Sequence, residues 1–261
     1  MFTALLVIIY VSFISLGLPD SLLGSAWPAI QKSLEAPLPF AGVISMIVSC
    51  GTVISSLMST RVIRRFGTGR VTLVSVAMTA FALLGFSFAP QVGWLCLLAV
   101  PLGLGAGSVD AGLNNFVALH YQAKHMSWLH CFWGIGATAG PIVMAFWIDR
   151  NNNWHAGYRT IGLLQVALVA VLLFSLPLWK KVSSPQEEAG EEAVVALPLR
   201  QVFRLPKAKG ALLGFFCYTA VEVTANLWTS SYAVKGFGVS EDTAAGWSSL
   251  FFLGITIGRL L

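Results

Sequence analysis

The sequence predicts an all-α membrane protein that crosses the bilayer eight times. Of its 261 residues, 56% are hydrophobic and 10% are charged, whereas a soluble domain carries roughly 25% charged residues. The mean hydropathy is +0.77. Eight apolar runs approach or exceed the ~20 residues with which a helix crosses the bilayer core. They lie at residues 2–30, 39–60, 71–89, 91–119, 126–148, 160–179, 210–234 and 243–261.

The basic residues predict the orientation. With the N-terminus in the cytoplasm, the inner connections hold eleven Lys and Arg residues and the outer ones hold four, namely Lys32, Arg150, Arg159 and Lys235. This asymmetry follows the positive-inside rule. We therefore expect a multi-pass protein of the inner or plasma membrane with a cytoplasmic N-terminus. Because the basic residues flank spans and do not line one soluble face, the net charge of +5 does not indicate a nucleic-acid partner.

The sequence carries no pattern of an enzyme or a metal site. The four cysteines lie inside predicted spans, have no CxxC spacing, and read as small buried hydrophobes. The segment HCFWG and the scattered serines show neither the spacing of a nucleophile elbow nor that of HExxH. We therefore expect no catalytic residues, no cofactor, no metal and no disulfide.

One long polar connection divides the spans into six and two. It covers residues 180–209, whereas every other connection is short. Two helix bundles joined by a cytoplasmic linker are the layout of a two-domain transporter. The prediction is a six-helix N-terminal bundle at 1–179, a cytoplasmic linker at 180–209, and a partial C-terminal bundle, with helices seven and eight, at 210–261.

Acidic residues recur inside the first, fourth and seventh spans. The first contains GLPDSLLGS and the fourth GSVDAGLNN, so both hold the pattern G-x-x-D, which ends at Asp20 and Asp110. In the seventh span Asn226 follows Glu222 by four residues, as Asn114 follows Asp110. Three-helix units repeated in alternating orientation place such helices around a central cavity. Because ionisable groups inside a membrane usually mark a path for ions or substrate, we expect these acids to line that cavity.

Glycines share the helix faces of the acids. Gly103 and Gly107 precede Asp110 on one face, and Gly17 precedes Asp20. Small residues permit close helix packing, and they can also leave open space. The sequence is consistent with both alternatives. We expect the face at Asp110 to open space beside the acid and to border a polar cavity.

Several segments together resemble a known family. They are LPDSLLGSAWP, GAGSVDAGLNNFVA, WLHCFWGIGATAGP, YTAVEVTANLWTSSY and SLFFLGITIGRLL. The chain is similar to the major facilitator superfamily and, within it, to the fucose–galactose–glucose/mannose:proton symporters. The resemblance implies the major facilitator fold, alternating access to a central site, and four further spans after Leu261. A fragment, or a truncated product without activity, is therefore a possible alternative.

The predicted function is proton-coupled symport of a neutral sugar, a hexose or deoxyhexose. Asp20 and Asp110 are the candidates for proton coupling, because burial disfavours the charged form of a carboxylate and lets it exchange protons. Side chains that can bind hydroxyl groups, or pack on the apolar face of a sugar ring, are the candidates for substrate binding. They are Asn114, Asn115, His130, Trp133, Gln165, Glu222, Asn226 and Trp228.

Some alternatives stay open. The segment GATAGP partly resembles a motif of exporters, so an exporter or antiporter of another small molecule is the second candidate. Sodium remains an alternative coupling ion, and the particular sugar is not predicted. The expected partners are the sugar, protons and the lipid bilayer, and the complete protein is expected to be a monomer.

Overall fold

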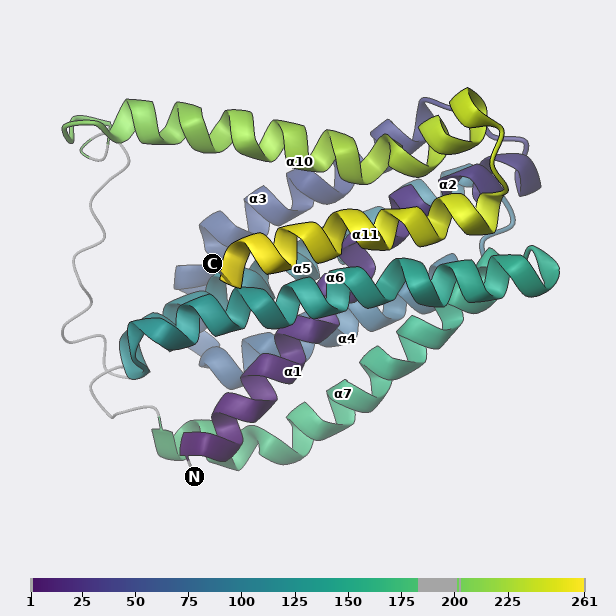
Figure 1. Cartoon of the computed structure of the whole chain (residues 1–261). Helices are drawn as coiled ribbons and strands as arrows, with labels where there is room; N and C mark the ends of the chain where they lie inside the picture. The colour runs from purple at the N-terminus through teal and green to yellow at the C-terminus, as the bar shows by residue number, and fades with distance from the viewer. Residues whose placement is uncertain (1, 183–200, 202, 261) are drawn as a thin grey trace.

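The computed structural model describes residues 2–182, 201 and 203–260, and every regular element in these ranges is a helix (Figure 1). The helices are α1 (Phe2–Asp20), α2 (Leu22–Ser33), α3 (Phe40–Phe66), α4 (Thr68–Phe86), α5 (Val92–His120), α6 (Ala123–Asn151), α7 (Trp154–Val182), α10 (Ala208–Phe237) and α11 (Glu241–Leu260). Most of the predicted linker lies outside the described residues.

The predicted spans are found as helices. Seven helical segments in the described ranges are long and apolar enough to cross a membrane: α1 with α2, then α3, α4, α5, α6, α7 and α10. The eighth predicted run forms α11, which falls outside that set. Its first turn holds Glu241 and Asp242, and its many small polar residues lower its hydropathy.

The first span is interrupted, although the sequence predicted one helix over residues 2–30. Helix α1 ends at Asp20, Ser21 forms a turn, and α2 begins at Leu22. Pro19 lies in the last turn of α1. Because proline has no N–H and its ring clashes with the carbonyl four residues earlier, it weakens the helix at this point. The acid of the first span therefore lies at a helix break.

Glycines bring α1 and α6 into backbone contact. A Cβ atom on Gly17 would collide with the carbonyl oxygen of Trp133 and lie 2.8 Å from the backbone nitrogen of Ala137. In the other direction, a Cβ atom on Gly136 would collide with the carbonyl of Ile14. Only glycine permits this approach, which sets α6 directly beside the end of α1 that carries the acid.

A second glycine seam joins α5 to α3. Cβ atoms on Gly103 and Gly107 would collide with the carbonyls of Val48 and Thr52. The hydroxyl of Ser56 donates a 3.1 Å hydrogen bond to the carbonyl of Gly107, and the hydroxyl of Thr52 is shared between the carbonyls of Val48 and Gly103, at 3.0 and 3.3 Å. The expectation that these glycines open space beside Asp110 is therefore wrong, because α3 fills that space.

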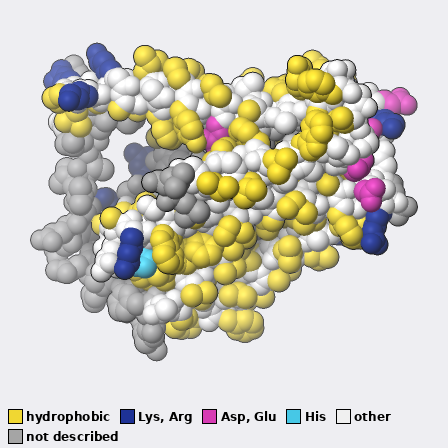
Figure 2. Space-filling model, in the orientation of Figure 1, with side chains coloured by type: hydrophobic (Ala, Val, Ile, Leu, Met, Phe, Trp, Pro, Cys, Tyr) yellow, Lys and Arg dark blue, Asp and Glu magenta, His cyan; other side chains and the backbone are white. Residues whose placement is uncertain are grey.

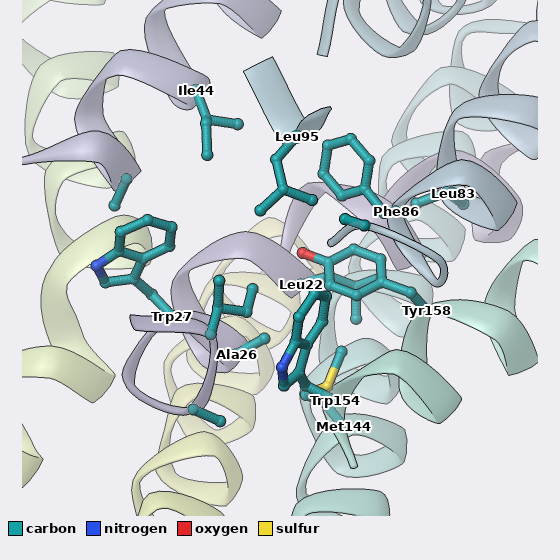
Figure 3. Packing of buried hydrophobic residues seen from close by; sticks show 14 of the residues in the cluster. Leu22, Ala26, Trp27, Ile44, Leu83, Phe86, Leu95, Met144, Trp154 and Tyr158 are labelled. Atoms are coloured by element: carbon teal, nitrogen blue, oxygen red, sulfur yellow. The ribbon is translucent and has the colours of Figure 1, made fainter. Parts of the chain in front are cut away.

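Two clusters of buried side chains form the core. One lies around α2 and includes the fully buried Trp27, Trp154 and Tyr158, which pack with Phe86 and Leu22 (Figure 3). The other gathers residues of α1, α4, α5, α6 and α7. Both clusters draw on several helices, so the core fixes where each span lies relative to the others.

The surface is apolar in the middle and charged toward its ends. Figure 2 shows hydrophobic side chains over the middle of one face and charged ones mainly near its two ends. We call the end where α7 ends and α10 begins the linker end, and the other the far end (Figure 1). At the far end Lys32 Nζ lies 3.2 Å from Glu241 Oε1, an ion pair that joins α2 to α11.

Candidate functional site

Two acids from other helices lie within electrostatic range of Asp20. Asp20 ends α1, Asp110 lies within α5, and Glu222 lies within α10. Asp110 and Glu222 both act electrostatically on Asp20. The structure thus brings together the acids of the first, fourth and seventh spans. We call this group, with the side chains that bond to it, the acid site.

Asp20 accepts hydrogen bonds from two other helices, one at its carboxylate and one at its backbone carbonyl. The indole Nε1 of Trp133, on α6, donates a 2.8 Å hydrogen bond to its carboxylate Oδ2. The side-chain nitrogen of Asn226, on α10, donates a 3.0 Å bond to its backbone carbonyl. The side chain of Asp20 nevertheless stays exposed.

The approach of α10 to this break is close. A Cβ atom on Gly24, in α2, would collide with the carbonyl of Asn226 and lie 2.9 Å from the Cα of Leu227. The bond from Asn226 to the Asp20 carbonyl thus forms where the two backbones touch. One predicted substrate residue therefore has a defined structural contact.

Asp110 is held mainly by its own helix. Asn114 Nδ2 donates to Asp110 Oδ1 at 2.9 Å and to its carbonyl at 3.0 Å. His130, on α6, interacts electrostatically with Asp110. The side chain of Asp110 is exposed. Like Asp20, it accepts one hydrogen bond from a side chain.

Two amide oxygens beside the acids are available as acceptors. Among the described residues, Oδ1 of Asn114 and Oδ1 of Asn226 are buried without a hydrogen-bond partner. Each amide donates its nitrogen within the acid site and keeps its oxygen unused. Because an unsatisfied buried acceptor is costly, a donor such as a hydroxyl group would be stabilised there.

Other predicted residues surround this group. His130 Nδ1 lies 2.9 Å from the carbonyl of Met126, and its ring centroid is 6.2 Å from that of Phe13. The ring of Trp133 meets that of Phe252, on α11, edge to face with centroids 6.2 Å apart. Trp133 therefore links three helices at the acid site.

The remaining predicted residues are not joined to the acids by any described hydrogen bond. Trp228 packs against the core around α2, and its ring lies near Gly42 on α3. Asn115 is exposed on α5, next to Asn114 but on an adjacent part of the helix surface. Gln165 is only 2% exposed, and its amide bonds to the carbonyl of Ser15 and the hydroxyl of Thr79. The structure does not bring Gln165 to the acid site.

A cavity that the sequence did not reveal lies at the far end. It has a volume of about 420 Å³ and lies between α2 and α10, beside the Lys32–Glu241 ion pair. Its lining also includes Gln31, Glu35, Ser231 and Lys235. The sequence shows charged residues at the ends of these spans, but it does not show that the spans are neighbours. The cavity could therefore be found only in the structure.

The described residues include no group of three or more His, Cys, Asp or Glu side chains that could hold a metal ion. The groups gathered at the acid site are carboxylates, amides, an imidazole and an indole. Such groups can exchange protons and bind hydroxyl groups.

The long apolar helices, with a few polar side chains gathered between them, are typical of a multi-pass membrane protein. Residues 9–261 match the sequence model of the Major Facilitator Superfamily. The chain therefore belongs to that superfamily.

Two curated relatives and one solved structure illustrate the match. The chain is 22% identical to Bypass of stop codon protein 6 of Saccharomyces cerevisiae, over 96% of this chain and 54% of that protein. It is 25% identical to the Glucose/mannose transporter GlcP of Bacillus subtilis, over 97% of this chain and 63% of the relative. The chain thus spans between about half and two thirds of the length of these relatives.

The fold is also that of a solved transporter. The crystal structure of a D-xylose-proton symporter matches 97% of this chain and 66% of its own, with a TM-score of 0.71 and 13% sequence identity. At this identity the match shows the fold alone. The predicted major facilitator fold is confirmed.

Proposed function

We propose that the complete gene product containing this chain is a secondary active transporter, which moves a neutral sugar together with protons by alternating access. The meeting of Asp20, Asp110 and Glu222 with unsatisfied amide oxygens carries this proposal. The similarity to a glucose/mannose transporter supports a hexose or deoxyhexose as substrate.

The two aspartates would carry the protons. Both side chains are exposed, and each accepts one side-chain hydrogen bond, from Trp133 to Asp20 and from Asn114 to Asp110. Carboxylates in electrostatic range repel one another, and a bound proton removes part of that repulsion. Access from one side at a time would then couple proton transfer to the movement of the helices.

The sugar would bind beside the carboxylates. The free amide oxygens of Asn114 and Asn226 suit hydroxyl donors, and the indole N–H of Trp133 lies at the same carboxylate. His130 interacts with Asp110, and Glu222 interacts with Asp20, so both are proposed as neighbours of the sugar. Asn115 and Trp228 are proposed only as outer contacts of this site.

The domain division and the orientation belong to the same proposal. Residues 1–179 would form one bundle, 180–209 the cytoplasmic linker, and 210–261 the start of the second bundle, in a monomer of the inner or plasma membrane. The linker end carries Arg61, Arg64, Arg65 and Arg70, among other basic residues. This charge excess supports a cytoplasmic linker end and N-terminus.

Labelling with an impermeant thiol reagent tests the orientation. In a background without the native cysteines, Gln91→Cys at the far end should react in intact cells, and Gln122→Cys at the linker end should react only after the cells are opened. The two positions are a matched pair, because both are exposed residues directly before a helix. Labelling of Gln122→Cys from outside would contradict the orientation.

Proton movement on addition of sugar tests the transport proposal. A hexose or deoxyhexose added to weakly buffered, energy-depleted cells should make the medium more alkaline, because protons enter with the sugar. The control is cells without the protein. A medium that becomes more acid would favour the antiporter alternative, and a rise in sodium uptake without a pH change would identify sodium as the coupling ion.

A further inference from the structure

A carbonyl in α1 has lost its intrahelical donor. In an α-helix, the N–H of residue 19 would bond to the carbonyl of residue 15. Residue 19 is Pro19, which has no N–H, so the carbonyl of Ser15 is left over inside the helix. Ser15 is itself buried. A buried carbonyl without a partner is unfavourable, so this position needs a donor from elsewhere.

Gln165 supplies that donor from another helix. Its Nε2, on α7, donates a 2.7 Å hydrogen bond to the carbonyl of Ser15. The hydroxyl of Thr79, on α4, lies 3.2 Å from Oε1 of the same amide and 2.9 Å from the carbonyl of Val76, so the two acceptors share its one proton. The amide nitrogen is therefore bonded in an interior where only 2% of the residue is exposed.

We infer that Gln165 is a positioning residue for Asp20. By taking the place of the missing N–H, it holds the bend that Pro19 introduces, one residue before the acid. That bend sets the direction in which α1 ends, and with it the 2.8 Å bond between Trp133 and the Asp20 carboxylate. The inference rests on the proposed function, in which Asp20 carries protons.

The bend also sets the contact with α10. The carbonyl of Asp20, at the helix break, receives the side chain of Asn226 at 3.0 Å. This carbonyl lies one residue after Pro19, so the backbone that Gln165 supports leads directly into the contact with Asn226. The amide of Gln165 thus acts on the acid site from outside, without touching the substrate.

A rescue experiment tests the hydrogen bond. Gln165→Met keeps the volume but leaves the Ser15 carbonyl unpaired, and should lower the Tm of the purified complete protein by on the order of 5 °C. In the double variant Pro19→Ala/Gln165→Met, residue 19 regains an N–H that can bond to Ser15, so most of the loss should be recovered. A double variant as unstable as Gln165→Met would overturn the inference.

Transport assays separate positioning from a purely structural role. The double variant should be stable, yet its altered first span should remove most of the up to about tenfold proton-driven accumulation that a pH difference of one unit supports in proteoliposomes, while exchange without a gradient continues. Recovery of accumulation together with the Tm would show that Gln165 only supports folding. Thr79→Val is the matched control: it removes the hydroxyl that lies near the amide oxygen, keeps Ser15 paired, and should retain accumulation.

The outcomes distinguish the two proposals. If the unaltered protein accumulates no sugar in response to a pH gradient, the proposed function fails, and the positioning role fails with it. If the unaltered protein accumulates sugar and the double variant does so equally well, only the positioning role fails. The Tm comparison reports on the Ser15 bond in either case.

Discussion

Asp110→Asn is expected to abolish proton-driven accumulation of sugar while leaving exchange across the membrane intact. The amide of asparagine has nearly the shape of the carboxyl group and can still accept the 2.9 Å bond from Asn114, but it cannot take up and release a proton. With one proton per sugar, a pH difference of one unit supports up to about tenfold accumulation. The variant should accumulate none.

Uptake into proteoliposomes with and without a pH gradient measures this effect. Asp149→Asn is the matched control, because Asp149 is an exposed acid at the far end of α6, outside the acid site. It should accumulate sugar as the unaltered protein does. Concentrative uptake by Asp110→Asn at the normal level would remove Asp110 from the coupling role.

Gly17→Val is expected to prevent α1 and α6 from packing. The new Cβ would collide with the carbonyl of Trp133 and lie within 3.0 Å of two further backbone atoms of α6. Because backbone atoms cannot rotate away, the helices must separate, at a cost of about 3 kcal/mol or more. Little folded protein should be recovered, as judged by its elution profile and Tm in detergent.

Gly93→Ala gives the control for this substitution. Gly93 also lies in a helix, α5, but a Cβ there meets nothing within 4 Å. The alanine should therefore leave the yield and the Tm unchanged or raise the Tm slightly. A Gly17→Val protein as stable as this control would show that the contact between α1 and α6 can relax.

The spans could be predicted from the sequence because the bilayer imposes one simple requirement, a run of about 20 apolar residues. The break at Ser21 could not. Four further prolines, Pro28, Pro101, Pro141 and Pro177, lie inside helices that continue past them. A proline in the sequence therefore does not show whether its span is interrupted, since neighbouring helices decide how the freed carbonyl is satisfied.

The acid site was predicted in outline through the repeat that links Asp20, Asp110 and Glu222, a signal that survives because equivalent helices occupy equivalent places. The part played by Gln165 was not predicted. A polar side chain in an apolar span has the same appearance in the sequence whether it faces a cavity or a carbonyl. Its partner, Ser15, is 150 positions away. The prediction for the glycines beside Asp110 was wrong for a similar reason. Their spacing in the sequence does not show that α3 packs against them.

The hydrogen bond from Trp133 to Asp20 also gives the protein an optical reporter. Indole emission depends on whether a neighbouring carboxyl group is charged or neutral. The chain has nine tryptophans, so the signal of Trp133 would be isolated by replacing the others with phenylalanine. Fluorescence followed in rapid mixing would then record the charge of a single carboxylate during a transport cycle, without an attached dye.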